Sequence, residues 1–190
     1  MSLQIIENTL IGIYENFLSK GECQHLLGSV KMRSSDEIEF YNELDPKYLF
    51  WEKKNIEFSS IPDFDFDLVN STQDRLKGVF LSEYLQDASA ANGFVQMNNI
   101  HRFLPGDSMM EHSDRGPKEN GNNDISHGFV VYLNDEYSGG EIYYPNLDIE
   151  VKPTAGTLVI HPSDVRHTHG VRPVTLGERY TLTMFAKDPS

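Results

Sequence analysis

The sequence contains a single cysteine, Cys23, so it can form neither an internal disulfide nor a cysteine-based zinc site. A reducing, intracellular setting is therefore the expected one. The first ten residues carry neither a positively charged start nor a long apolar stretch, so no signal peptide is predicted. No run of about 18 apolar residues occurs either, and we expect a cytoplasmic protein without a membrane span.

Basic residues are scarce as well. The 16 Lys and Arg residues face 29 Asp and Glu residues, which gives a formal net charge of −13. Binding to a phosphate backbone needs a positive surface, so a nucleic acid partner is not expected. The acidity fits a need for solubility, or a basic partner that it would attract. The sequence gives no indication of the oligomeric state.

The length of 190 residues suits one domain that buries a core of its own. We expect residues 1–92 to form a supporting region of helices and strands. Residues 3–14 are predicted to form a strand pair or one long strand. A helix with a capping box at Ser19–Glu22 is expected at about 20–32, and a second helix is expected to begin at Asp67 or Asn70. Residues 34–66 lack a clear period, and we interpret their aromatic side chains as core residues or as neighbours of a substrate: Tyr41, Tyr48, Phe50 and Trp51.

Residues 93–190 have a different pattern, in which short apolar stretches alternate with turn residues. The predicted strands lie near 94–104, 108–112, 126–134, 140–144, 147–152, 157–160, 165–172 and 178–187. Such a rhythm is typical of a sandwich or barrel, and this number of strands suits a double-stranded β-helix, or jelly roll. We therefore predict a mainly β protein whose jelly-roll catalytic core spans residues 93–190.

A candidate metal site lies within this second part. The tripeptide His112-Ser113-Asp114 and a later histidine supply two imidazoles and one carboxylate, the ligand set that holds Fe(II) while leaving positions open. On an extended strand, residues 112 and 114 point to the same side and can reach one ion. His169, His167 and His161 are the candidates for the third ligand.

Six motifs occur in order between residues 94 and 187: His112-x-Asp114, Tyr132-Leu133-Asn134-Asp135, Gly139-Gly140-Glu141 with Tyr144-Pro145, Pro153-x-x-Gly156, His169-x-Val171-x-Pro173-Val174 and Gly177-x-Arg179-Tyr180. In this order and spacing the chain resembles the prolyl 4-hydroxylase-like 2-oxoglutarate/Fe(II)-dependent dioxygenases. The resemblance implies a jelly-roll core, Fe(II), 2-oxoglutarate and O2, and it admits ascorbate as a further cofactor. The implied reaction hydroxylates a carbon, most typically of a prolyl residue in a peptide or protein, and converts 2-oxoglutarate to succinate and CO2.

The resemblance also assigns roles to single residues. It makes His112, Asp114 and His169 the metal ligands, in preference to His161 and His167. These two, together with His101 and His127, are then expected to be polar surface or pocket residues.

A second set of roles concerns the co-substrate. Arg179 is expected to anchor the distal carboxylate of 2-oxoglutarate, because a guanidinium pairs with a carboxylate through two parallel hydrogen bonds. Thr181 and Tyr132 are expected to add contacts to the same co-substrate. Relatives often carry a tyrosine where this chain has Phe103, so one usual hydroxyl is missing. Arg102 is either a substrate contact or a paired structural side chain.

Other classes of protein remain compatible with these residues. A cupin-like metal-binding protein shares the jelly roll but does not need Arg179. A zinc hydrolase needs a general base beside the metal, and Glu111 is expected on the opposite face of the strand from His112. A catalytically silent interaction domain, or a hydroxylase acting on a small metabolite or another amino-acid side chain, is a further alternative.

Overall fold

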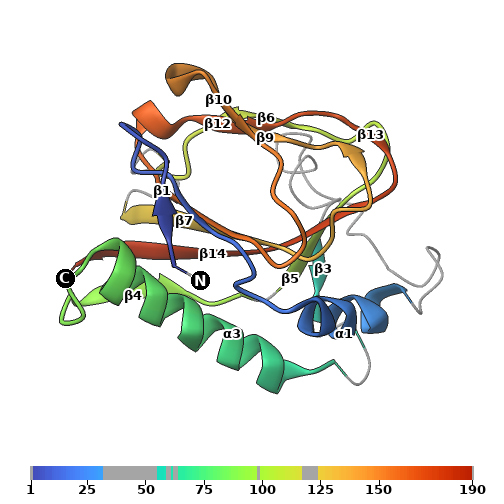
Figure 1. Cartoon of the computed structure of the whole chain (residues 1–190), viewed down its shortest axis with the longest axis horizontal. Helices are drawn as coiled ribbons and strands as arrows, with labels where there is room; N and C mark the ends of the chain where they lie inside the picture. Colours follow the sequence, from blue (N-terminus) through green and yellow to red (C-terminus); the bar gives the residue numbers. More distant parts are fainter. Residues whose placement is uncertain are drawn as a thin grey trace.

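Three layers make up the computed structural model, which describes residues 2–31, 55–58, 61, 64–97, 99–116 and 124–189. Helices α1 and α3 lie beneath a larger sheet, and a smaller sheet lies above it (Figure 1). Four aromatic residues whose role the sequence leaves open lie outside the described residues: Tyr41, Tyr48, Phe50 and Trp51.

The larger sheet is antiparallel and contains strands from both halves of the chain. Its order is β1 (Gln4–Ile5), β2 (Gly12–Tyr14), β11 (Leu158–Pro162), β7 (Ile125–Tyr132), β14 (Arg179–Pro189), β5 (Asn99–Phe103) and β3 (Asn55–Glu57), and β4 (Asn92–Val95) also pairs with β14. The N-terminal strands therefore extend the same sheet that carries the C-terminal ones.

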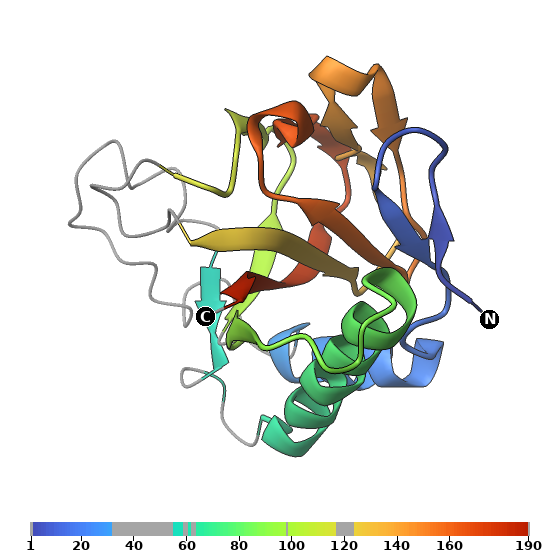
Figure 2. The same ribbon diagram turned by 90° about the vertical axis from the view of Figure 1, so that its left-hand side faces the viewer.

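The smaller sheet has the order β10 (Ile149–Val151), β9 (Ile142–Tyr144), β12 (His169–Val171) and β6 (Met109–His112). A separate short pair joins β13 (Val174–Leu176) to β8 (Ser138–Gly139). The two main sheets face each other, with the helices on the far side of the larger one (Figure 2). This arrangement confirms the predicted mainly β fold with a jelly-roll core and supporting helices.

Side-chain hydrogen bonds cap the N-terminus of both helices. At α1 (Lys20–Lys31), the N–H of Ser19 donates to Glu22 Oε2 (2.7 Å) and the N–H of Glu22 donates to Ser19 Oγ (3.2 Å), so the predicted capping box is confirmed. At α3 (Phe66–Val79), Asp65 Oδ1 accepts from the N–H of Leu68 (2.8 Å). The predicted start at Asp67 or Asn70 is wrong, because the earlier carboxylate provides the cap. A short π-helical turn, Phe80–Tyr84, continues α3.

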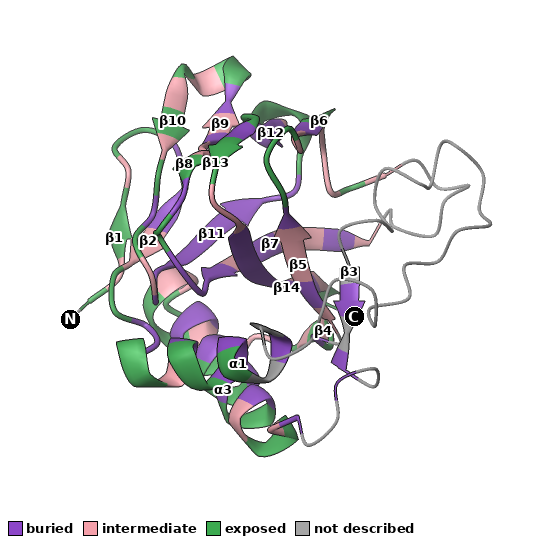
Figure 3. Ribbon diagram, turned by 90° about the vertical axis from the view of Figure 1, so that its right-hand side faces the viewer, coloured by how far each residue is buried: buried purple, intermediate pink, exposed green. Residues whose placement is uncertain are grey.

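The main core fills the space between these helices and the larger sheet. Leu76 of α3 and Phe80 are fully buried, as are Phe129 of β7 and Leu182 of β14 on the facing side of the sheet. Burying one such side chain stabilises the fold by about 1.5–3 kcal/mol. Figure 3 shows buried residues concentrated in β7, β11 and β14, while the outer faces of both helices are exposed. The helices thus support the sheet that forms the floor of the site.

Two of the predicted strands are not continuous in the structure. The stretch 94–104 forms β4 and β5 rather than one strand, and the N–H of Met97 between them donates to Gln73 Oε1 on α3 (2.9 Å) instead of to a neighbouring strand. The stretch 165–172 begins as a 3-10 turn, Val165–His167, because the Asp164 side chain accepts from the N–H of His167 (3.2 Å). Only its second half is strand β12.

Three short strands, β3, β8 and β13, were not predicted. Neither α1 nor α3 has the length and apolar character that a membrane crossing requires, which holds for every helix of the described residues.

Candidate metal centre

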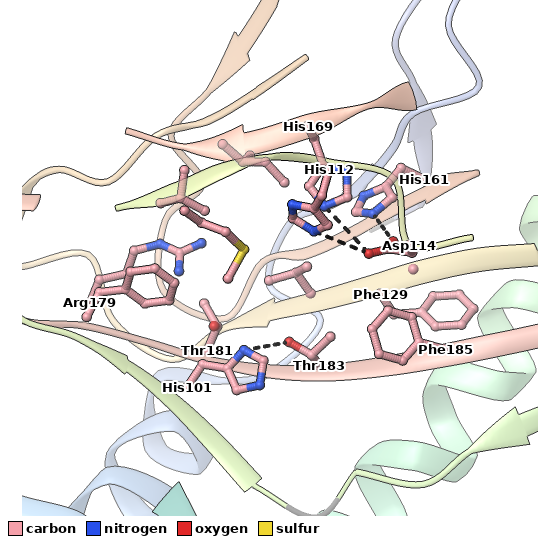
Figure 4. A pocket seen from close by; sticks show the side chains of 16 residues that line it. His101, His112, Asp114, Phe129, His161, His169, Arg179, Thr181, Thr183 and Phe185 are labelled. Atoms are coloured by element: carbon pink, nitrogen blue, oxygen red, sulfur yellow. Dashed lines mark hydrogen bonds and ion pairs between the residues drawn. The ribbon is translucent and has the colours of Figure 1, made fainter. Parts of the chain in front are cut away.

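Two strands of the smaller sheet bring the candidate metal ligands together. β6 and β12 run antiparallel, with His112 directly opposite His169, and their ring centroids lie 4.4 Å apart. Asp114 follows β6 by two residues and turns towards both rings (Figure 4). One potential ligand atom from each residue lies within 4.8 Å of the other two. This nitrogen and oxygen donor set fits Fe(II) held on one face.

The same carboxylate oxygen approaches both imidazoles. Asp114 Oδ1 lies 3.5 Å from His112 Nε2 and 3.8 Å from His169 Nε2. Metal–ligand bonds to such atoms measure about 2.0–2.2 Å, so one ion between the three atoms can contact all of them. The structure therefore groups the three residues that the sequence selects as metal ligands.

Backbone carbonyls orient the two rings. His112 Nδ1 donates to the carbonyl of Met110 (2.9 Å), and His169 Nδ1 donates to the carbonyl of His167 (3.1 Å). A carbonyl only accepts, so the proton of each neutral ring lies on Nδ1 and the lone pair lies on Nε2. Both rings thus present a metal-binding nitrogen to the centre.

The charge states also suit metal binding. Burial raises the pKa of Asp114, but the neighbouring imidazoles of His112 and His161 outweigh this effect, and the pKa is lowered overall. Burial, with a smaller contribution from nearby His161, lowers the pKa of His169 to about 3. At neutral pH the carboxylate is therefore ionised and the His169 ring is neutral, which are the forms that bind a metal.

The other two candidate histidines lie outside this group of three. His167 is fixed on both sides, since its Nδ1 contacts Asp164 Oδ1 (2.7 Å) and its Nε2 contacts the carbonyl of Thr9 (2.6 Å). His161 on β11 contacts the other oxygen of Asp114, with 3.1 Å between its Nε2 and Oδ2. Sequence reasoning treated His161 as a pocket or surface residue and missed this contact, because nothing in the local pattern distinguishes it.

Arg179 lies at the other end of the same pocket (Figure 4). It begins β14, and Thr181 and Thr183 follow at alternate positions on the pocket side. Arg179 is 2 % exposed, and its guanidinium donates to the hydroxyl of Tyr132 (3.1 Å) and has a buried Nε without a partner among the described residues. A buried cation with an unused donor favours an anionic ligand.

Aromatic rings enclose this guanidinium. Its central carbon lies 4.8 Å from the ring centroid of Phe103 and 4.9 Å from that of Tyr132. Phe103 has no hydroxyl, unlike the tyrosine that relatives often carry, but its ring stacks on the guanidinium. Tyr137, which sequence reasoning did not select, lies near Arg179 on the other side of Gly140. A Cβ added at Gly140 would be 3.0 Å from Arg179 Cδ and 3.1 Å from a ring carbon of Tyr137, so both side chains border this glycine. The sequence feature that could have pointed to Tyr137 is its position just before the Gly139-Gly140 motif.

The pocket between the two ends is mainly apolar. Its lining includes side chains from both sheets: Phe103, Met109, Val130, Ile142, Val171 and Phe185. His101 of β5, which the sequence analysis expects at the surface or in the pocket, adds a polar group to this lining, with its Nδ1 3.3 Å from Thr183 Oγ1. Burial, with a smaller effect of Arg179, lowers the pKa of His101 to about 4, so this ring is neutral at neutral pH.

Arg102 belongs to the paired alternative. Its Nε and Nη2 donate to the two carboxylate oxygens of Glu178 at 3.1 and 3.2 Å. Its neighbours His101 and Phe103 line the pocket, so alternation along β5 points Arg102 to the opposite face. Glu111 is exposed and likewise alternates away from His112, so it offers no general base beside the metal ligands.

Comparison with known proteins identifies a matching family and solved structures with a similar fold. The family model described as the 2OG-Fe(II) oxygenase superfamily matches residues 96–187. Human prolyl 3-hydroxylase 1 is 36% identical over 66 residues, which cover 32% of this chain and 9% of that protein. Human prolyl 3-hydroxylase 3 is 38% identical over 61 residues, covering 30% of this chain and 8% of that protein. The matching segments thus span about a tenth of these relatives.

Three solved structures share the fold across nearly the whole chain. The viral collagen prolyl hydroxylase of Paramecium Bursaria Chlorella virus-1 aligns with a TM-score of 0.67 at 19% identity, covering 98% of this chain and 100% of that one. The Trichoplax adhaerens prolyl hydroxylase, in complex with a hypoxia inducible factor peptide fragment, gives 0.70 at 18% identity and coverages of 95% and 84%. A Pseudomonas putida prolyl-4-hydroxylase gives 0.64 at 18% identity and coverages of 96% and 95%.

Proposed function

We propose that this chain, which belongs to the 2OG-Fe(II) oxygenase superfamily through residues 96–187, is a 2-oxoglutarate- and Fe(II)-dependent dioxygenase of the prolyl hydroxylase type. The observation that carries the proposal is the placement of His112, Asp114 and His169 at one end of a pocket whose other end holds the buried Arg179. A metal-binding protein without this activity has no need for a buried cation at that position.

In this proposal, His112, Asp114 and His169 hold Fe(II). When bound, the ion supplies the activation of O2 that couples the decarboxylation of 2-oxoglutarate, to succinate and CO2, with hydroxylation of a substrate carbon. The three residues occupy one face, so the remaining positions stay available for the co-substrate and oxygen. Ascorbate, which the resemblance admits, is proposed as a further cofactor.

Arg179 is the proposed anchor of the distal carboxylate of 2-oxoglutarate. Its stacking on Phe103 and its hydrogen bond to Tyr132 fix the direction of the guanidinium before the ligand arrives. Tyr132 and Thr181 lie opposite each other across β7 and β14, and we assign both as further contacts to the same carboxylate. The apolar walls exclude water, which strengthens the charge-assisted pairing in the pocket.

A prolyl residue in a peptide or protein is the proposed substrate. The support comes from the relatives, which include prolyl 3-hydroxylases and a prolyl hydroxylase bound to a peptide fragment. The test is to incubate the protein with Fe(II), 2-oxoglutarate, O2 and a library of proline-containing peptides, and to map any added oxygen by mass spectrometry.

The expected result is one added oxygen on a proline of a subset of peptides, together with one succinate per added oxygen. Matched peptides with alanine in place of that proline, and the His112→Ala protein, serve as controls and should give neither. Oxygen added to another side chain would contradict the prolyl assignment, and an absence of 2-oxoglutarate-dependent succinate across all substrates would contradict the enzyme class.

A further inference from the structure

The two oxygens of the Asp114 carboxylate have different partners. Oδ1 faces Nε2 of His112 and Nε2 of His169, at 3.5 and 3.8 Å, and is the oxygen directed at the metal position. Oδ2 points the other way and lies 3.1 Å from Nε2 of His161. Figure 4 shows His161 beside Asp114, on the side away from Arg179. The carboxylate is thus divided between a metal-facing atom and a protein-facing atom.

His161 is itself held from behind. Its Nδ1 lies 2.9 Å from the hydroxyl of Tyr144, and both side chains are buried, with exposures of 1% and 0%. An ionised carboxylate only accepts hydrogen bonds, so the proton of the His161 ring lies on Nε2 and Nδ1 accepts from the Tyr144 hydroxyl. Tyr144 therefore fixes the ring in the form that donates to Asp114.

A glycine makes this contact possible. Gly128 of β7 lies directly opposite His161 of β11 in the antiparallel register. A Cβ at Gly128 would lie 2.5 Å from Asp114 Oδ2 and 2.6 Å from His161 Nε2, which is closer than real Cβ contacts come. At this position on the floor of the site, only glycine leaves room for the hydrogen bond between His161 and Asp114.

We propose that His161, oriented by Tyr144, is a positioning residue that keeps Asp114 a one-oxygen ligand of the metal. A carboxylate can bind a metal through one or both of its oxygens. With Oδ2 engaged by His161, only Oδ1 is available, and the position that Oδ2 would occupy stays open for 2-oxoglutarate or O2. The inference rests on the proposed function for the identity of these ligands, but its structural part concerns only the carboxylate.

The test compares His161→Phe, which removes the donor, with His161→Gln, whose amide N–H can replace it. Co(II) is titrated into each purified protein as a probe metal, and 2-oxoglutarate is then titrated into the Co(II) protein, with visible absorption as the readout. His127→Phe is the matched control, because His127 lies on the neighbouring strand and its ring packs against Phe80 and Tyr84 instead.

We expect His161→Phe to bind Co(II) about 10–100-fold more weakly and to show an altered Co(II) spectrum. Its affinity for 2-oxoglutarate should fall further, because the second carboxylate oxygen then competes for the open position. His161→Gln should restore most of the affinity and the spectrum, and His127→Phe should behave like the unaltered protein. A purely structural role of His161 would not separate the Phe and Gln variants in this way.

An unaltered Co(II) affinity and spectrum in a folded His161→Phe protein would overturn the proposal. If that variant does not fold, Tyr144→Phe provides the test, since it removes only the hydroxyl that fixes the ring. It should give a smaller loss of Co(II) affinity and the same spectral change, and identity with the unaltered protein would overturn the proposal. Failure of the unaltered protein to bind Co(II) or Fe(II) would instead contradict the proposed function itself.

Discussion

His169 lies directly opposite His112 in the antiparallel pair of β12 and β6, so hydrogen bonds of the smaller sheet set the spacing between the two imidazoles. A slip of one residue in this register would turn one of the rings to the other face of the sheet. The backbone carbonyls of Met110 and His167 then fix the rotation of each ring. The spacing of the two imidazoles at the metal position is therefore a consequence of strand pairing.

The first prediction separates His169 from its neighbour His167. His169→Ala should abolish Fe(II)-dependent succinate formation, because it removes one of three grouped ligand atoms. His167→Ala should keep most of the activity, since the side chain of His167 contacts Asp164 and Thr9 instead. Succinate release under saturating Fe(II) measures both variants. Full activity of His169→Ala would disprove the assignment of this ligand.

The second prediction concerns the co-substrate anchor. Arg179→Ala should raise the 2-oxoglutarate concentration for half-maximal activity by an order of magnitude or more, because a charge-assisted pair is worth about 1.5–3 kcal/mol. Arg102→Ala is the matched control on the neighbouring strand: its guanidinium pairs with Glu178 and faces away from the pocket, so the requirement should stay unchanged. The same requirement in both variants would show that Arg179 does not bind the co-substrate.

The third prediction tests the helix cap that the sequence placed incorrectly. Asp65→Ala should lower the free energy of unfolding by about 1 kcal/mol, because the N–H of Leu68 loses its acceptor. Asp67 is the second residue of α3, and Asp67→Ala removes only a favourable charge near the helix start. This substitution should lower the free energy of unfolding by about 0.3–1 kcal/mol. Urea unfolding followed by circular dichroism measures both. A larger loss for Asp67→Ala would refute the cap assignment.

The fourth prediction is a dependence of stability on pH. Burial lowers the pKa of His127 to about 4, whereas an unfolded histidine titrates near about 6.5. Between these values the unfolded chain binds a proton that the folded chain does not, so stability is present above about pH 6.5 and falls as the pH drops towards 4. The loss attributable to this residue is about 1–3 kcal/mol.

His127→Phe removes that contribution, so its free energy of unfolding should fall less between pH 7 and pH 4 than that of the unaltered apoprotein. Other histidines with lowered pKa, such as His101, keep part of the dependence in place. Parallel urea titrations at the two pH values measure the difference. An identical pH dependence in both proteins would show that His127 titrates in the folded state much as it does in the unfolded chain.

Local patterns predicted the elements that depend on local interactions. The capping box at Ser19 and Glu22, the strand containing His112 and the long C-terminal strand containing Arg179 all depend on neighbouring residues, and the sequence located them. The cap at Asp65, the break before β5 and the 3-10 turn before His169 depend on which side chain reaches which backbone N–H. The sequence offers several equivalent candidates for each, so only the structure decides between them.

The candidate site shows the same division. Motif order selected His112, Asp114, His169 and Arg179, and the structure places them around one pocket. The contact of His161 with Asp114 arises from the pairing of β11 with β7, and no sequence period reports which residue lies opposite Gly128. Residues that support the ligands from a neighbouring strand are therefore the part of the site that sequence patterns reveal least.

The decisive measurement for this pocket is an anaerobic titration of the apoprotein, first with Fe(II) and then with 2-oxoglutarate, followed by visible absorption. We predict a weak charge-transfer band that appears only when both are present. The band should be absent from His169→Ala and should need much more 2-oxoglutarate in Arg179→Ala. A protein that shows no band with both added, or that binds zinc in preference and ignores 2-oxoglutarate, would contradict the assignment of this pocket as an oxygenase site.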